Sequence, residues 1–304
     1  MVRPCGVKSR NLSPYLVCFG IISLMKRIKS VVLFYNSKRK KALSFVSSLE
    51  RRLKTRGVRI FKVCVNEGIC EFGKADVGIT VGGDGTVLYA ARHVIKRGIP
   101  VLGINAGGLG FLSGVERSDF EKRLDLFLNG GFKRIKRQLL SVEVFRRGKK
   151  MLGPYPALND CVIRSMEPRA FTLRACFGRQ FLSEYFGDGL IISTPTGSTA
   201  YNLAALGPIV LPELEVFLLS PVCPHSLTHR PIVLSSLEDI TITVGGRPGR
   251  NHNVSLSLDG QENSVLRTAD RIIIRKYPRN FEMLAPHDFS YFDILRRKLR
   301  WGKR

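Results

Sequence analysis

Hydrophobic and polar positions follow two different patterns along this chain, and the first covers residues 30–137. Residues 31–35 are an uninterrupted apolar run, which is typical of a strand buried on both faces of a parallel sheet. Apolar side chains at 42, 43, 45, 46, 49 and 53 then follow helical spacing. An alternation of this kind predicts an open, doubly wound (Rossmann-like) α/β sheet, which binds ligands at the carboxyl ends of its strands. Its further predicted elements are strands at 58–65, 77–81 and 99–104, a helix from about Thr86 and a helix at 120–127.

From about Arg137 the pattern changes to short β-like segments separated by turns. Many short strands at this spacing predict an antiparallel β sandwich rather than further β-α-β units. The predicted segments lie near 139–146, 158–164, 170–177, 189–193, 232–234, 240–244, 254–258 and 271–274.

A glycine-rich turn, Gly82-Gly83-Asp84-Gly85-Thr86, connects the predicted strand at 77–81 to the helix that follows. A strand that enters a tight turn and then a helix leaves free N–H groups at the positive end of the helix dipole, where phosphate binds. Asp84 is unusual in such a turn, because a carboxylate repels phosphate. It fits if it binds a metal, or if it accepts a proton from a hydroxyl that is being phosphorylated. The alternative is an ordinary turn that uses glycine only for its backbone freedom.

A second segment, about a hundred residues further on, runs from Asp188 to Ala204 with the sequence DGLIISTPTGSTAYNLA. The first turn alone also resembles diacylglycerol and sphingosine lipid kinases and, more loosely, phosphofructokinases. The second segment resembles the signature of the NAD kinase family, and shorter pieces follow the family order, so that the resemblance covers roughly residues 28–302. These pieces are 102–107, 109–112, 157–160, 223–227, 230–233, 259–261 and 289–292.

The resemblance implies transfer of the γ-phosphoryl group of ATP to the 2′-hydroxyl of the adenosine ribose of NAD, which gives NADP. Asp84 would be the catalytic base, and a Mg²⁺ ion carried on ATP would neutralise phosphate charge. No metal site made by the protein itself is expected. The residues implied to bind NAD or ATP are Gly83, Asp84, Gly85, Thr86, Asn159, Asp160, Arg169, Asp188, Thr199, Ala200, Tyr201, Asn202, Leu203, Ala204 and Gln261.

Three of these residues have alternative interpretations. The pair Asn159-Asp160 stands where the family carries Asn-Glu, so Asp160 is shorter by one methylene, and an adjacent Asn-Asp is also typical of a turn. Arg169 lies near a basic substrate-binding position of the family, but the correspondence is loose by one residue. Tyr201 offers an aromatic face for adenine, or packs in the core.

The family architecture implies an α/β domain at 25–137, a β-rich NAD-binding domain at 138–277, and a C-terminal tail, 278–304, that returns to the first domain. It also implies a homo-oligomer, a dimer or tetramer, whose pockets neighbouring subunits complete. Residues 1–24 match nothing in the family pattern. They resemble the outline of a signal peptide without a cleavage site, and their eleven-residue apolar run is too short to span a bilayer. A mitochondrial leader is an alternative; the simplest account is translation from Met25.

The formal net charge of +25 is concentrated near the chain ends, with fourteen basic residues and one acidic residue before residue 58. Such an excess is compatible with nucleic-acid binding. However, no aromatic residues are interleaved with the basic runs and no zinc-finger, RRM or KH pattern is present, so a surface suited to polyanionic substrates is the preferred interpretation. The seven cysteines contain no C-x-x-C pair, which favours reduced thiols in the cytoplasm. A lipid kinase and a basic nucleic-acid-binding module remain the rival functions.

Overall fold

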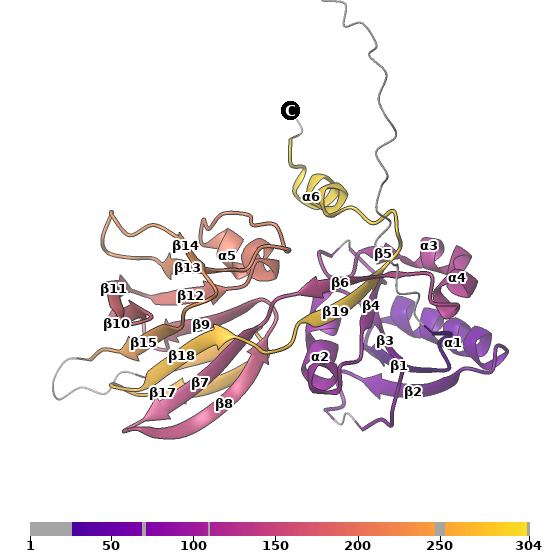
Figure 1. The fold of residues 1–304 in the computed structure, drawn as a ribbon, viewed down its shortest axis with the longest axis horizontal. Coiled ribbons are helices and arrows are strands. Elements are labelled where there is room, and N and C mark those ends of the chain that lie inside the picture. The colour runs from indigo at the N-terminus through magenta and orange to yellow at the C-terminus, as the bar shows by residue number, and fades with distance from the viewer. Residues whose placement is uncertain (1–25, 69–70, 109, 247–252, 303–304) are drawn as a thin grey trace, which may run out of the picture.

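The first domain is built on a seven-stranded sheet (Figure 1). The structure is a computed structural model that describes residues 26–68, 71–108, 110–246 and 253–302; the predicted leader at 1–24 lies outside them. The strand order is β2-β1-β3-β4-β19-β6, with the short β5 beside β4. The strands are β1 (Ser30–Tyr35), β2 (Arg59–Cys64), β3 (Val77–Gly82), β4 (Val101–Asn105), β5 (Val115–Glu116), β6 (Lys133–Arg137) and β19 (Phe281–Ala285).

Helices cover both faces of this sheet because successive side chains of each strand point to opposite sides. Val31 and Leu33 pack with one set of helices, whereas Val32 and Phe34 pack with the other. The first set is α1 (Lys40–Lys54), α3 (Arg117–Lys122) and α4 (Leu124–Leu128); the second is α2 (Asp84–Val94), which continues into a 3-10 turn at Ile95–Arg97. The prediction of one helix at 120–127 is wrong, since Arg123 leaves helical geometry at φ −105° and ψ 11° and separates α3 from α4.

The second domain consists of two six-stranded antiparallel sheets that share one apolar core. The orders are β11-β10-β15-β18-β7-β8 and β14-β13-β12-β9-β16-β17. An α/β sheet followed by antiparallel sheets was predicted, and this is confirmed. The strands are β7 (Leu140–Arg146), β8 (Lys149–Ala157), β9 (Asp160–Ser165), β10 (Phe171–Phe177), β11 (Gln180–Gly187), β12 (Gly189–Ser193), β13 (Val216–Val222), β14 (Ile232–Ser235), β15 (Ile240–Val244), β16 (Val254–Leu258), β17 (Glu262–Leu266) and β18 (Arg271–Lys276).

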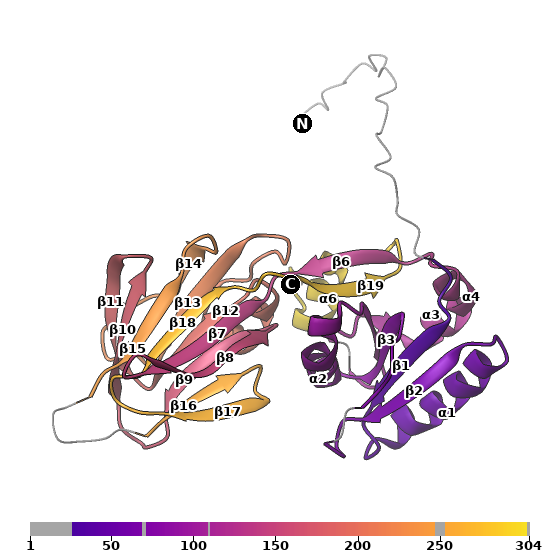
Figure 2. The same cartoon turned by 60° about the horizontal axis from the view of Figure 1, so that its bottom comes forward.

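The chain crosses between the domains twice, from β6 to β7 and again from β18 to β19 (Figure 2). β19 pairs in parallel with β4 and antiparallel with β6, so the chain after residue 280 completes the first sheet. The last helix, α6 (Tyr291–Leu299), follows β19 and lies next to the first domain (Figure 1). Within the residues that the structure describes, no helix is both long enough and apolar enough to cross a membrane.

Candidate active site

The glycine-rich turn lies where β3 ends and α2 begins, as its sequence predicts. Gly83 precedes the helix in an extended conformation, and Asp84 is the first helical residue. Gly82 is required because a Cβ there would collide with the Thr86 side chain. Gly85 is exposed, and nothing lies within 4 Å of the Cβ position at Gly83 or Gly85. The turn therefore presents open backbone at the positive end of an eleven-residue helix.

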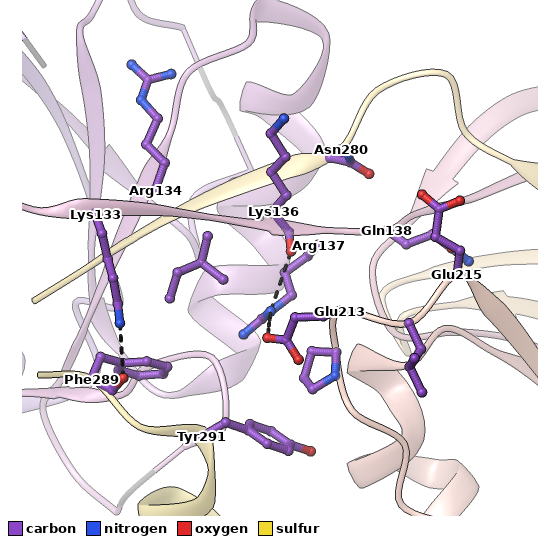
Figure 3. Close-up of a pocket in the computed structure, with 13 residues that line it drawn as sticks. Lys133, Arg134, Lys136, Arg137, Gln138, Glu213, Glu215, Asn280, Phe289 and Tyr291 are labelled. Carbon is purple, nitrogen blue, oxygen red and sulfur yellow. Dashed lines mark hydrogen bonds and ion pairs between the residues drawn. The ribbon is translucent and has the colours of Figure 1, made fainter. Parts of the chain in front are cut away.

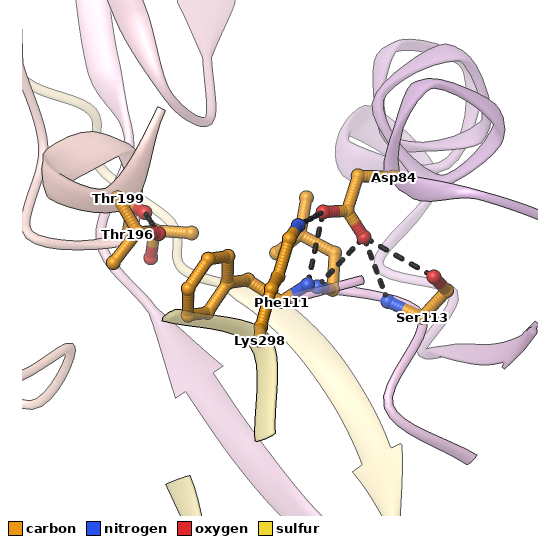
Figure 4. A network of polar contacts seen from close by, with 7 residues as sticks. Asp84, Phe111, Ser113, Thr196, Thr199 and Lys298 are labelled. Carbon is orange, nitrogen blue, oxygen red and sulfur yellow. Dashed lines mark hydrogen bonds and ion pairs between the residues drawn. The ribbon is translucent and has the colours of Figure 1, made fainter. Parts of the chain in front are cut away.

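The Asp84 carboxylate does not point freely into solvent but is held by the loop that follows β4 (Figure 4). Its Oδ2 accepts the N–H of Phe111 at 2.9 Å, and its Oδ1 accepts the N–H groups of Leu112 at 2.9 Å and Ser113 at 3.1 Å. The Ser113 hydroxyl donates to Oδ1 at 3.2 Å. Gly110 is required beside it, because a Cβ there would collide with the carboxylate.

The surroundings of Asp84 keep it ionised. Burial alone would raise the pKa of this carboxyl, but the N–H groups of Phe111 and Leu112, the Lys298 ammonium and the N–H of Ser113 together lower it below its usual value. The Lys298 Nζ lies 3.4 Å from Oδ2. Asp84 is therefore a fixed negative charge at the start of α2.

A cavity of about 390 Å³ in the second domain brings several predicted residues together. Asn159, Asp160, Ala200 and Tyr201 all line it, together with the turn at 259–260. Tyr201 is 40% exposed, so its side chain does not pack in the core. Its ring offers an aromatic face to the cavity.

Two carboxylates, Asp160 and Asp259, meet in this cavity. Asp259 has a positive φ of 53°, and its carboxylate accepts the N–H groups of Leu158, Asn159 and Asp160 at 2.8, 2.6 and 3.1 Å. Among the described residues, none makes a hydrogen bond to the Asp160 carboxyl, which is buried. Burial, and then the charge of Asp259, raise the pKa of Asp160 to about 7.

The segment from Asp188 to Ala204 contains all of β12, a 3-10 turn (Thr196–Thr199) and the short α5 (Tyr201–Ala204). Asn202 is fully buried and holds this segment together, because its amide donates to the carbonyls of Ser198 and Pro208 and accepts the Ser220 hydroxyl. Arg169 and Asp188 are exposed and do not line the cavity.

The buried polar atoms without a hydrogen-bond partner in the described part of the chain include Thr196 Oγ1, in the second segment, and Gln261 Oε1, beside the glycine-rich turn. A buried polar atom without a hydrogen bond costs about 1–3 kcal/mol, which a ligand with polar edges would recover. The sequence pattern does not distinguish Thr196 from its neighbours. Its only signal was its place among the hydroxyls of the second segment.

The turn after β16 connects this cavity to the glycine-rich turn of the first domain. Gln261 Nε2 donates to the Gly85 carbonyl at 2.9 Å, and Glu262 forms an ion pair with Arg92 of α2. Asp259, Gly260 and Gln261 are consecutive, so three residues span the distance from the cavity wall to the glycine-rich turn.

A second cavity, of about 530 Å³, lies between the domains under the start of α6 (Figure 3). The buried Arg137 guanidinium lies 3.3 Å from Glu213. Lys133 Nζ donates to the carbonyls of His287 and Phe289 at 3.0 and 3.2 Å. These contacts fix the segment that leads into α6.

The second domain holds a cavity of a size that suits a nucleotide, and the first domain holds a glycine-rich turn of the kind that binds phosphate. Together with the fold, these two features define a two-domain nucleotide-binding protein. Comparison with known proteins gives the family. Residues 69–132 match the ATP-NAD kinase N-terminal domain and residues 159–285 match the ATP-NAD kinase C-terminal domain. The chain is 40% identical to the NAD kinase of Geobacter metallireducens over 76% of this chain and 80% of that protein. It is 38% identical to the NAD kinase of Chromohalobacter salexigens over 85% of this chain and 93% of that protein. The chain belongs to the NAD kinase family.

Solved structures show the same fold. Yeast NADH kinase complexed with NADH superimposes with a TM-score of 0.78 at 22% identity, and the match covers 91% of this chain and 89% of that one. An NAD kinase from Archaeoglobus fulgidus in complex with ATP gives a TM-score of 0.72 at 24% identity over 89% of this chain and 98% of that one.

Proposed function

We propose that this protein transfers the γ-phosphoryl group of ATP to the 2′-hydroxyl of the adenosine ribose of NAD, with NADP and ADP as products. The observation that carries the proposal is the bridge from the Asp160 cavity to the glycine-rich turn through Gln261 and the Gly85 carbonyl. An acceptor held in the cavity and a donor held at the turn would lie next to each other, which is the main requirement of phosphoryl transfer.

The donor half of the site is the start of α2. Gly83 and Gly85 present open backbone where a helix N-terminus attracts phosphate, whereas the Thr86 side chain is buried against Gly82. Mg²⁺ on the donor phosphates supplies charge neutralisation when it is bound. The ion would be carried by the nucleotide, because Mg²⁺ is usually bound through substrate phosphates with few protein ligands.

The acceptor half is the cavity of the second domain. The Asn159 amide and the Asp160 carboxylate can hold ribose hydroxyls, and the Tyr201 ring can stack on adenine. Thr196 Oγ1 and Gln261 Oε1 would find partners on the nucleotide. Ala200 lines the cavity, Asn202 keeps the segment in place, and we assign Thr199, Leu203 and Ala204 to nucleotide binding on the resemblance alone.

Asp84 is the proposed proton acceptor. As the ribose oxygen bonds to phosphorus, the bond from phosphorus to the bridging oxygen of ADP breaks and that oxygen keeps the electron pair. The hydroxyl proton passes to Asp84. Phosphoryl transfer passes through a loose transition state in which the proton leaves late, so a carboxylate with a low pKa can serve.

The remaining proposals concern organisation. We assign residues 25–137 and 278–304 to the α/β domain and residues 138–277 to the NAD-binding domain, in a cytoplasmic homo-oligomer. Asp188 and Arg169 are exposed outside the cavity of their own chain, which fits a role in the cavity of a neighbouring subunit. No specific nucleic acid is a partner, so binding to random DNA should fall steeply with salt and show no sequence preference.

The test is to incubate the purified protein with Mg-ATP and either NAD or diacylglycerol, and to detect NADP with an NADP-specific dehydrogenase. We expect NADP from the first mixture and no phosphorylated lipid from the second. Product from the lipid alone would contradict the proposal.

A further inference from the structure

The C-terminal helix α6 places a lysine beside the catalytic carboxylate. Lys298 Nζ lies 3.4 Å from Asp84 Oδ2 and 4.4 Å from the centre of the Phe111 ring (Figure 4). The two charged residues are 214 positions apart in sequence. No sequence pattern around Lys298 indicates this contact.

The position of α6 is fixed by packing on the first domain. Ser290 caps the helix by accepting the Asp293 N–H at 3.3 Å, and Ile294 and Leu295 are buried. Lys298 follows these two residues at spacings of four and three, so it lies on the same face of the helix. Arg297 forms an ion pair with Glu116. The helix therefore carries Lys298 on a rigid support rather than on a free tail.

The ion pair with Lys298 is not needed to satisfy Asp84. Without Lys298, Oδ1 accepts the N–H groups of Leu112 and Ser113 and the Ser113 hydroxyl, and Oδ2 accepts the Phe111 N–H. Oδ2 therefore keeps a second lone pair, which faces Lys298 and could instead accept a proton. The Lys298 contact is the longest of the five, and the Lys298 side chain is 33% exposed. The ammonium can consequently exchange this partner for another anion, while the Phe111 ring continues to attract it.

We propose that Lys298 is a catalytic residue that binds the transferred phosphate of the donor. This rests on the proposed function. A γ-phosphate at the Gly83–Thr86 turn would lie beside Asp84, within reach of the same ammonium, and its charge would draw Nζ away from the carboxylate. Lys298 then stabilises the negative charge on the transferred group, and Asp84 loses the positive neighbour that depresses its basicity.

The proposed phosphoryl transfer conserves atoms and charge. The 2′-hydroxyl loses its proton to Asp84 and forms the new oxygen–phosphorus bond. The oxygen that bridges the β and γ phosphorus atoms leaves with the electron pair as part of ADP. Lys298 keeps all its protons and contributes only charge and hydrogen bonds.

The experiment compares Lys298→Met and Lys298→Arg with Arg296→Met. Arg296 is the matched control, because it carries the same charge on the same helix but pairs with Asp293 three residues away. We expect Lys298→Met to lower kcat/KM for ATP about 100-fold, the effect of removing one donor to a developing charge. Lys298→Arg should recover much of the loss, and NAD affinity, measured by calorimetry, should stay within about twofold in all three.

The pH profile adds a readout that a purely structural role would not move. Lys298 contributes to the low pKa of Asp84, and the base must be ionised, so the acid limb of kcat/KM for ATP should move to higher pH in Lys298→Met. Kinetics for Lys298→Met that match those of Arg296→Met would overturn the proposal. A wild-type protein that binds ATP but forms no NADP would instead contradict the proposed function, and Lys298 would then be judged by the ATP affinity of the same three variants.

Discussion

Asp84 in the first domain and Asp160 in the second are the carboxylates of the two halves of the proposed site, and they lie in opposite environments. Asp84 is half-buried, accepts three backbone N–H groups and lies beside Lys298. Asp160 is buried next to the carboxylate of Asp259, and its own carboxyl makes no hydrogen bond to the described residues. The pKa of Asp84 is lowered, whereas that of Asp160 is raised to about 7. One residue type thus gives a permanent charge at the donor turn and a titrating group in the acceptor cavity.

The two environments indicate which half of the reaction each carboxylate serves. A carboxylate fixed by several donors keeps its position through the reaction, as a proton acceptor beside phosphate must. A carboxylate without partners has its hydrogen-bonding capacity free for a ligand, and ribose hydroxyls would supply the missing donors. We therefore expect loss of Asp84 to remove chemistry and loss of Asp160 to remove binding.

The largest effect is expected from a substitution in the donor half of the proposed site. Asp84→Asn keeps the shape of the side chain but removes the charge, so we expect turnover to fall by about 10²–10⁴, the usual contribution of a general base. The control is Ser113→Ala, which deletes one hydrogen bond to the same carboxylate and should leave at least about a tenth of the turnover. Steady-state NADP formation at saturating substrates measures both, and near-normal turnover in Asp84→Asn would exclude Asp84 as the base.

The next effect concerns the acceptor half. A charge-assisted hydrogen bond to a ribose hydroxyl is worth about 1.5–3 kcal/mol, so Asp160→Ala should weaken NAD use by at least about tenfold. Asp160→Glu restores the residue that the family usually carries and should do less harm. Kinetics with NAD varied decide the matter. If alanine matches wild type, Asp160 is only a turn residue; if glutamate is as harmful as alanine, the cavity is fitted to the shorter side chain.

A smaller effect should follow pH. Asp160 is ionised above about pH 7 and neutral below it, so its charge-assisted hydrogen bonds are lost as the pH falls. We expect NAD affinity to drop about fivefold between pH 8 and pH 6, measured by calorimetry at constant ionic strength. The matched variant is Asp160→Asn, in which this dependence should vanish. The same slope in both proteins would assign it to another group.

The smallest effect tests the bridge between the halves. Gln261→Ala removes the hydrogen bond to the Gly85 carbonyl, which is worth about 1 kcal/mol, so KM for NAD and for ATP should each rise less than about tenfold. Gln180→Ala, on an exposed position of β11, is the control and should change neither constant. A rise confined to one substrate would show that Gln261 belongs to one half only.

The features that could be predicted from the sequence are those that a local pattern of residues determines. The buried strands β1, β3 and β4 are largely apolar runs, and the glycine-rich turn required a particular backbone, so both were found. Strands β8, β11 and β17 were missed because they lie at sheet edges, where neither face is consistently apolar. The inner strand β13 was also missed, although it is largely apolar.

The environment of each carboxylate was beyond prediction for a physical reason. Donors to Asp84 come from Phe111, Leu112, Ser113 and Lys298, and Asp160 meets Asp259 across 99 positions of sequence. Such contacts depend on how the sheets pack, and no spacing rule records them. The resemblance supplied the candidate residues, and only the structure distinguishes their surroundings.

NAD binding to Asp84→Asn and Asp160→Ala, measured side by side by isothermal titration calorimetry without ATP, tests the division of labour between the two carboxylates most directly. The account predicts that Asp84→Asn binds NAD within about twofold of wild type, while Asp160→Ala binds at least about tenfold more weakly. The reverse order, with NAD affinity lost in Asp84→Asn and kept in Asp160→Ala, would contradict it.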